Sequence, residues 1–166
     1  LHVNQKLVDM SPDDPNYMID GNDGGLNITR DRGKTWHFAQ NIPVGQFYHI
    51  AVDNDIPYNI YGGMQDNGSW AGPAYTWRAQ GIRNSYWQEI SFGDGFDVLP
   101  DPNNHRFGIS ASQEGSAVIY DRLTGNNEGI QPTHPERKEK LRFNWNAAMN
   151  RDPFNSNTLY FGSQFV

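Results

Sequence analysis

Four segments of the chain repeat one pattern in the same order, and this repetition restricts the fold more than any other feature of the sequence. Each segment contains a short apolar strand, a turn of Asp, Pro and Asn residues, a second apolar strand and a small polar turn. Asp9, Asp53, Asp101 and Asp152 mark the four turns, spaced by about 44, 48 and 51 residues. Repeats of about 40–50 residues with several strands each are typical of β-propeller blades.

The repeat predicts an all-β chain, a β-propeller fragment of about three four-stranded antiparallel blades and half of a fourth. We place the complete blades at residues 5–42, 47–91 and 96–146, and the half-blade at 147–166, all in one partial propeller domain. The first strands are expected at Lys6–Met10, His49–Asp53, Phe96–Leu99 and Ala147–Asn150. The second strands are expected at Tyr17–Asp20, Asn59–Gly62, Arg106–Ser110 and Thr158–Gly162. A β-sandwich with accidental similarity between its strands is the alternative.

An aromatic strand is expected to close each complete blade. The three segments are Thr35–Phe38, Tyr86–Ile90 and Phe143–Trp145. Because Trp36, Trp87 and Trp145 recur at one blade position, we expect them to be core residues. Only Pro132–Arg142 has a helical composition, and we expect it as an insertion between the third and fourth strands of the third blade.

The composition narrows the partners of the chain. The net charge is −6 and no basic stripe is present, so we expect no nucleic-acid partner. The absence of cysteine excludes disulfides and thiolate metal sites. No run approaches the roughly 20 apolar residues of a membrane helix, so we expect no membrane span. Three and a half blades would leave two apolar faces open, and we expect the remaining blades of a longer chain or a second copy to cover them.

One motif in the first blade is specific. Thr29, Asp31, Gly33, Thr35 and Trp36 occupy every fixed position of the Asp-box pattern, Ser/Thr-x-Asp-x-Gly-x-Thr-Trp. The Asp carboxylate can accept backbone N–H bonds in a tight turn, the Gly can supply a positive φ, and the Trp can pack under the hairpin. The motif therefore predicts a structural fastener rather than a catalytic group.

The chain resembles Asp-box (BNR) repeat β-propellers of the sortilin-type, glycosyl-hydrolase-like bacterial family. The Asp box carries the resemblance, together with the stretches Gly21–Leu26, Ile42–His49, Tyr61–Trp70 and Gly93–Asp97. The resemblance covers nearly the whole chain. It implies a fragment of a long exported protein, located outside the cell or in the periplasm. It also implies kinship with glycoside hydrolases and with sorting receptors, so it indicates the fold more firmly than the activity.

Two kinds of connection meet at one end of each predicted blade, namely the turn from strand two to strand three and the connection to the next blade. The turns contain Asn22, Asp23, Gln65, Asp66, Asn67, Gln113 and Glu114. The connections contain Gln46, Tyr48, His49, Asp94 and Asp97. Carbohydrate clefts use this mixture of acids, amides and aromatic rings, with two carboxylates for acid, base or nucleophile roles.

From this rim we select candidate functional residues. The candidate catalytic carboxylates are Asp23, Asp66 and Asp94. The candidate substrate-binding residues are Trp70, Trp77, Gln65, Gln113 and Tyr48. Asx-Gly turns also occur at tight corners without any substrate, so a structural role for each Asp stays open, as does a core role for His49.

Two functions from different classes remain. The first is a carbohydrate-active propeller, glycoside hydrolase-like, with a polysaccharide cleft on the propeller face. The alternative is a non-catalytic propeller that binds peptide or protein, as sorting receptors do, or a structural repeat module. We expect no cofactor and no metal: the five His residues show no ligand spacing, and the acidic loop Asp94–Asp97 has fewer ligands than a recognised calcium loop, although a calcium ion there stays open.

Overall fold

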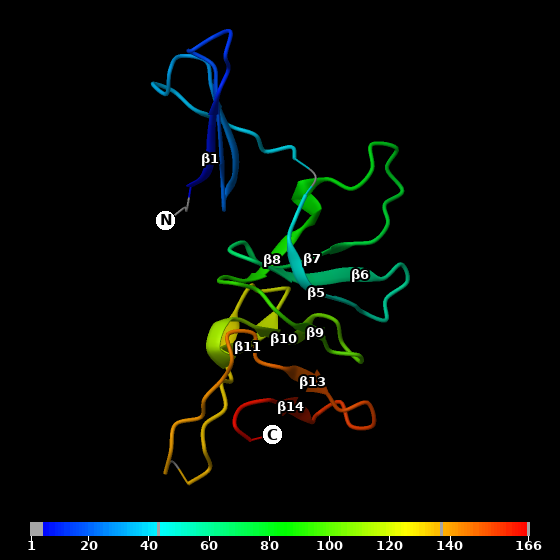
Figure 1. The fold of residues 1–166 in the computed structure, drawn as a ribbon. Helices are drawn as coiled ribbons and strands as arrows, with labels where there is room; N and C mark the ends of the chain where they lie inside the picture. Colours follow the sequence, from blue (N-terminus) through cyan, green and yellow to red (C-terminus); the bar gives the residue numbers. More distant parts are fainter. Residues whose placement is uncertain (1–4, 43, 137, 166) are drawn as a thin grey trace. The chain divides into compact units, whose positions relative to one another are not determined.

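The computed structural model describes residues 5–42, 44–136 and 138–165, and side chains from Val8 onward. The chain forms two compact units, Leu1–Gly45 and Gln46–Val166 (Figure 1).

The first unit is one four-stranded antiparallel sheet. Its strands are β1 (Gln5–Met10), β2 (Met18–Asn22), β3 (Gly25–Thr29) and β4 (His37–Phe38), paired in chain order. Asp20 and Thr29 are its buried residues, and no apolar side chain among residues 8–42 is buried.

The second unit contains two more four-stranded sheets and a two-stranded one. The second sheet consists of β5 (Phe47–Val52), β6 (Asn59–Met64), β7 (Gly68–Pro73) and β8 (Gln88–Ser91). The third sheet consists of β9 (Val98–Pro100), β10 (Phe107–Ala111), β11 (Ala117–Asp121) and β12 (Asn127–Gly129). The fourth sheet consists of β13 (Met149–Arg151) and β14 (Leu159–Phe161). Every pairing is antiparallel between strands that follow one another in the chain, and Figure 1 shows the sheets following one another from green to red.

These sheets confirm the predicted all-β fold of three four-stranded antiparallel blades and half of a fourth. Helical structure among the described residues is limited to two single turns, η1 (Asn84–Tyr86) and η2 (Gln113–Gly115). None of the described helices is long and apolar enough to cross a membrane.

Two apolar clusters hold the second unit together, one at each junction between sheets. Tyr61, Ala71 and Ile90 of the second sheet pack on Val98 and Tyr120 of the third. At the next junction the third sheet packs on the fourth through Ile109, Ala111, Ala117 and Met149, with Leu99, Ile130, Leu159 and Phe161 beside them. Neighbouring sheets therefore bury their faces against each other, as propeller blades do.

The first turn of each repeat has the same hydrogen bond, which fixes the register of the repeats. The residue after strand one donates its backbone N–H to the carbonyl six positions later. The donors are Ser11, Asp53, Asp101 and Asp152, and the acceptors are Tyr17, Asn59, Phe107 and Thr158. The position equivalent to Asp53 in the first sheet is thus Ser11, and the choice of Asp9 as the repeat marker was wrong by two residues.

The end of the third blade differs from the prediction. Its fourth strand is β12, which lies before the proposed insertion, so Phe143–Trp145 is not that strand. The described residues of Pro132–Arg142 form turns, bends and irregular chain, not a helix. The predicted core role of the tryptophans is also wrong for Trp36 and Trp145, which are 43% and 54% exposed. Trp87 is half-buried and lies over Gly72 of β7.

Candidate functional site

One end of the second unit gathers acidic and aromatic side chains, which we call the acidic rim. It consists of Tyr48, His49, Asp66, Asp94, Asp97 and Trp145. Tyr48 and His49 lie on β5, Asp66 in the β6–β7 turn, and Asp94 and Asp97 in the β8–β9 loop. Trp145 comes shortly before β13. The antiparallel topology places these connections at the same end of the strands.

Asp94 is the centre of the acidic rim. Its carboxylate is buried, and its Oδ1 accepts the backbone N–H of Asp66 at 2.7 Å. Its Oδ2 accepts the indole N–H of Trp145 at 2.9 Å. One side chain therefore fixes both the β6–β7 turn and the exposed indole ring, and it uses both of its oxygens to do so.

The loop that carries Asp94 lies directly against the second sheet. Gly68 donates its backbone N–H to Gly93, and Gly95 donates to Met64, each at 2.9 Å. A Cβ atom at Gly63 would overlap the backbone of Gly95. Only a glycine at position 63 allows this close approach, so the position of Asp94 depends on a glycine near the end of β6.

Tyr48 provides a second aromatic surface on the acidic rim. Its ring is 39% exposed and packs on Phe96 with a centroid separation of 4.8 Å. Partial burial and the negative charges of Asp94 and Asp66 raise the pKa of the Tyr48 hydroxyl. Tyr48 is therefore a neutral hydrogen-bonding group at neutral pH, close to two carboxylates.

His49 and Asp97 form an ion pair next to this centre. The Nδ1 of His49 lies 3.0 Å from Oδ1 of Asp97, and its Nε2 lies 3.2 Å from the side-chain amide of Asn146. Burial raises the pKa of Asp97, while the charge of His49 and the backbone N–H of Met149 act in the opposite direction. β5, the β8–β9 loop and the segment before β13 thus meet in one polar group.

The structure brings together some of the predicted site residues. Asp66, Asp94 and Tyr48 lie in the acidic rim. Gln113 lies in η2 with its side chain over Gly93 of the same loop, and Gln65 precedes Asp66 in the β6–β7 turn. Asp23 lies in the β2–β3 turn of the first unit, where Asn22 accepts the backbone N–H of Gly24 at 2.9 Å.

The two predicted sugar-stacking tryptophans lie elsewhere. Trp70, on β7, is half-buried and donates its indole N–H to the carbonyl of Asn67 at 2.6 Å. Trp77 follows the far end of β7, because this strand runs from Gly68, opposite Met64, away from the Asp66 turn. Trp77 is 88% exposed and touches Tyr75 edge to face, so the structure places it at the opposite end of the sheet from the acidic rim.

Trp145 is the rim residue that the sequence pattern did not reveal. The segment with Phe143 and Trp145 resembles the aromatic closing strands of the first two blades in sequence. This resemblance suggested that Trp145 is a core residue. Glu114 donates its backbone N–H to the carbonyl of Trp145 at 3.1 Å, and Phe143 packs on Gly115. These contacts with η2 hold the Phe143–Trp145 segment at the rim instead of in a sheet.

The sequence motif at residues 29–36 forms the β3–β4 turn, and Asp31 holds that turn together. Asp31 Oδ1 accepts the Thr29 hydroxyl at 2.8 Å and the Thr35 backbone N–H at 2.9 Å, and its Oδ2 accepts the Thr35 hydroxyl at 2.6 Å. These bonds lower the pKa of Asp31 to about 2, and the bond from the Thr35 hydroxyl contributes most to this shift. Gly33 has a φ of 82° and lies against the Trp36 ring.

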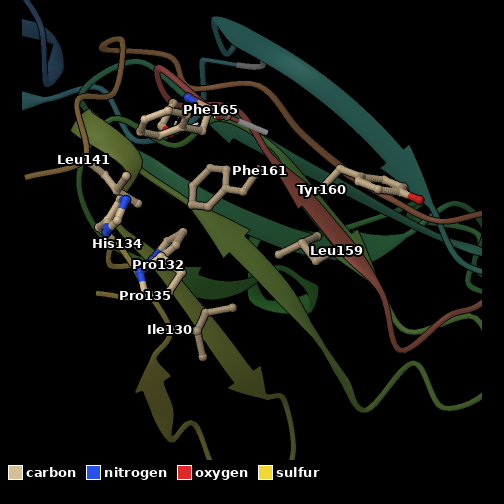
Figure 2. Close-up of a pocket in the computed structure, with 10 residues that line it drawn as sticks. Ile130, Pro132, His134, Pro135, Leu141, Leu159, Tyr160, Phe161 and Phe165 are labelled. Atoms are coloured by element: carbon tan, nitrogen blue, oxygen red, sulfur yellow. Dashed lines mark hydrogen bonds between the residues drawn. The ribbon is translucent and has the colours of Figure 1, made fainter. Parts of the chain in front are cut away.

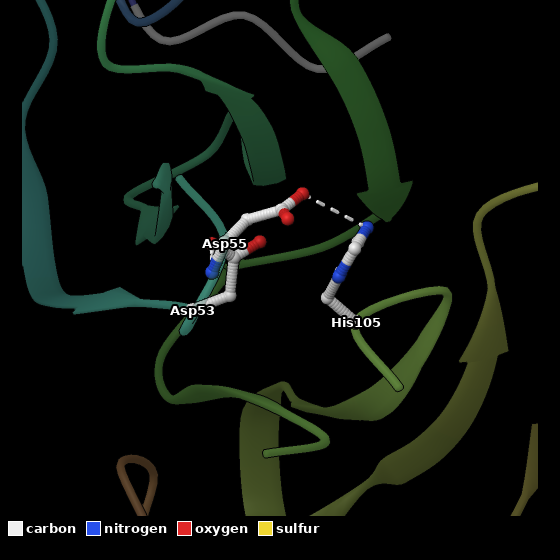
Figure 3. Close-up of side chains that lie close together, drawn as sticks. All are labelled: Asp53, Asp55 and His105. Carbon is white, nitrogen blue, oxygen red and sulfur yellow. Dashed lines mark hydrogen bonds and ion pairs between the residues drawn. The ribbon is translucent and has the colours of Figure 1, made fainter. Parts of the chain in front are cut away.

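A separate group of possible cation ligands lies at the far end of the sheets, where Asp53, Asp55 and His105 come within 4.8 Å of one another (Figure 3). Asp53 already accepts four hydrogen bonds, from the backbone of Asp55 and Asn59, the amide of Asn59 and the hydroxyl of Tyr61. Burial works to raise the pKa of Asp53, but the bonds from Asn59 and Tyr61 outweigh it and lower the pKa. His105 pairs with Asp55 at 3.1 Å, so turn formation and an exposed ion pair account for the group.

No family model matches the chain, and no curated protein matches it. Among solved structures, the chain is similar to YCF48 from Cyanidioschyzon merolae, with 16% sequence identity and a TM-score of 0.37. The match covers 92% of this chain and 49% of YCF48, so the chain spans about half the length of that protein.

Proposed function

We propose that the acidic rim binds glycans and that the protein is a carbohydrate-active propeller of the glycoside-hydrolase type. One observation carries this proposal: two exposed aromatic rings, Tyr48 and Trp145, lie around the carboxylate of Asp94. Aromatic faces suit the apolar faces of sugar rings, and neighbouring carboxylates and amides suit sugar hydroxyls. The exposed Asp66 and Asn146 supply such groups beside the rings.

For hydrolysis, the carboxyl groups of the acidic rim differ in their suitability. Asp94 uses both oxygens within the protein, so we assign it to positioning Trp145 and the Asp66 turn. Asp97 has a raised pKa, which suits a group that donates a proton to the leaving sugar oxygen. Asp66 is exposed and suits the opposite role of base or nucleophile. Water supplies the hydroxyl group to the cleaved glycosidic carbon.

Glycans that bind the protein are first identified on a glycan array. Calorimetric titration with these glycans then tests the binding site. We expect Trp145→Ala and Tyr48→Ala each to weaken binding by about tenfold, since loss of a stacked ring removes on the order of 1 kcal/mol. Trp77→Ala distinguishes the two ends of the sheet: a loss of binding in this variant alone would place the cleft at the far end and overturn the proposal.

Hydrolysis requires a separate measurement. Release of reducing sugar by the wild-type chain, lost in Asp66→Asn while glycan binding persists, would support the enzymatic part of the proposal. Binding without turnover in the wild type would leave a lectin-like rim and contradict hydrolysis.

A further inference from the structure

Two acidic turn residues, Asp66 and Glu114, lie on either side of the β8–β9 loop. Asp66 belongs to the β6–β7 turn and Glu114 to η2 between β10 and β11, so they occupy matching turns of neighbouring sheets. Asp66 donates its backbone N–H to Asp94 of the loop at 2.7 Å, and the side chain of Gln113 lies over Gly93. Glu114 is exposed, and it adds a carboxylate that the proposed hydrolysis does not use.

Both residues have a backbone conformation that favours glycine. The φ angle is 62° at Asp66 and 55° at Glu114. Residues with a Cβ atom adopt this region at a cost in free energy, and Asp tolerates it better than Glu does. A glycine would therefore form the turn at position 114 more easily, which makes the Glu114 side chain a candidate for a role outside the turn itself.

Glu114 lies next to an exposed aromatic ring that is held in place. Its backbone N–H donates to the carbonyl of Trp145 at 3.1 Å, and the side-chain amide of Gln131 donates to the carbonyl of Glu114 at 3.0 Å. The indole N–H of Trp145 bonds Asp94, and 54% of the residue is exposed. A carboxylate and an aromatic face together suit an ammonium group, because the charge attracts it and the ring adds a cation–π contact.

The charges at this end of the sheets also favour a cationic ligand. The connections at residues 65–67, 92–97 and 112–116 contain no Lys or Arg, and they contain four acidic residues, Asp66, Asp94, Asp97 and Glu114. Five arginines lie in or next to the connections at the opposite end, namely Arg78, Arg83, Arg106, Arg122 and Arg151. After partial burial, the charges of Asp94 and Asp66 are the causes that raise the pKa of Tyr48, so the negative field extends to that ring.

Further described cations, at residues 138–142, belong to the long β12–β13 connection. Leu141 of this connection lines a cavity of about 500 Å³ together with Phe161 of β14 (Figure 2). Gln164, shortly after β14, accepts the backbone N–H of Arg142 at 2.6 Å and donates to the carbonyl of Lys140 at 3.1 Å. This part of the connection therefore lies along the fourth sheet.

We propose that Glu114 and Trp145 form a subsite for a protonated amine, and that the glycan preferred by the acidic rim is an amino sugar with free amino groups. This inference rests on the proposed glycan binding at the acidic rim and adds the class of glycan. The ammonium group meets the Glu114 carboxylate, while the sugar ring can still stack on the indole. An acidic glycan would instead bring its own carboxylates against those of the rim.

Calorimetric titration with three β-1,4-linked tetramers tests this preference. The tetramers of glucosamine, N-acetylglucosamine and glucose share length and linkage, but only the first is cationic at about pH 6, below the pKa of an ordinary amine. The wild type should bind the glucosamine tetramer about tenfold more tightly than either uncharged one, equivalent to about 1.4 kcal/mol. Equal affinities would overturn the amino-sugar preference and leave glycan binding intact. If none of the three bound, the preference would also be wrong, and the glycan array would decide separately on the proposed function.

A matched pair of variants locates the preference at Glu114. Glu114→Gln removes the charge and keeps the size, so affinity for the glucosamine tetramer should fall about tenfold while affinity for the glucose tetramer stays unchanged. Glu128→Gln makes the same change in net charge at an exposed position on β12, and it should keep the preference. A preference that survives in Glu114→Gln, or that is lost equally in both variants, would contradict the subsite.

Two further measurements separate this role from simpler explanations. Glu114→Gly removes the backbone strain, so its urea midpoint should rise while the preference for the glucosamine tetramer is lost. A lower urea midpoint would instead show that Glu114 serves the turn. Tetralysine tests the need for a sugar: binding as tight as that of the glucosamine tetramer would mean that the acidic rim attracts any polycation, and would overturn the assignment to amino sugars.

Discussion

Aspartate side chains close tight turns in this protein by accepting backbone hydrogen bonds. Asp31 does so in the turn between β3 and β4. Asp121 closes the turn between β11 and β12 in the same way, since its Oδ1 accepts the backbone N–H of Leu123 at 2.9 Å. The pKa of Asp121 lies well below its usual range, and the side-chain hydrogen bond from Arg106 is the largest cause of this shift. The third sheet therefore closes its equivalent turn without the sequence motif of residues 29–36.

The lowered pKa of Asp31 makes the first sheet sensitive to acid. The carboxylate has a pKa of about 2 in the folded chain and about 3.9 when unfolded. Its contribution to stability is complete above the unfolded pKa and is lost as the pH falls through about 2. Asp31→Asn, which cannot titrate, should lower the urea midpoint of this sheet at pH 7 and flatten its decline between pH 5 and pH 2. An unchanged pH profile in this variant would show that the carboxylate does not stabilise the turn.

At the scale of strands and sheets, a polar contact links the second sheet to the third. Tyr61 donates its hydroxyl to Asp53 at 2.9 Å and accepts a bond from Arg122 at 2.6 Å. Gln88 of β8 also donates to the carbonyl of Arg122. The pKa of Tyr61 is raised, mainly because its hydroxyl is buried, so the phenol stays protonated and can donate a hydrogen bond. The junction between these sheets is therefore both apolar and hydrogen-bonded.

Removing this hydroxyl should weaken the junction. Tyr61→Phe leaves a buried carboxylate and a guanidinium each short of one partner, which costs about 1.5–3 kcal/mol of unfolding free energy. Tyr160 is the matched control, because it bonds Asp152 at 2.8 Å in the equivalent position but is 48% exposed. Urea unfolding should show a clearly smaller loss for Tyr160→Phe. Similar losses in both variants would mean that the link to Arg122 adds nothing.

The sequence pattern predicted those elements that carry apolar residues. First and second strands were found in every repeat because apolar residues and Asp/Pro turns mark both ends. β12 was not predicted, because its residues Asn127, Glu128 and Gly129 are all exposed and do not alternate between apolar and polar residues. The acidic rim could be anticipated from topology, which places Asp66 and Asp94 at one end. Trp145 could not, because its position depends on contacts with η2 rather than on a strand pattern.

For the whole molecule, apolar burial is distributed unevenly. Every apolar side chain that is buried among the described residues lies in Gln46–Val166. The first sheet instead combines backbone pairing with turn bonds, and it exposes Val8, Met10 and Phe38. Since apolar burial is the main term that offsets conformational entropy, the two units should differ in local stability.

Hydrogen exchange measured by mass spectrometry can detect this difference. Local opening needs less free energy where few apolar contacts are broken, so amides of β2 and β3 should exchange faster than those of β6 and β10. Tyr61→Phe serves as the internal control, because it should speed exchange in β6 and leave β2 unchanged. If β2 and β6 instead exchanged at one common rate, and both responded to Tyr61→Phe, the two units would open together. The first sheet would then owe its stability to cooperation with the second unit rather than to its own turns.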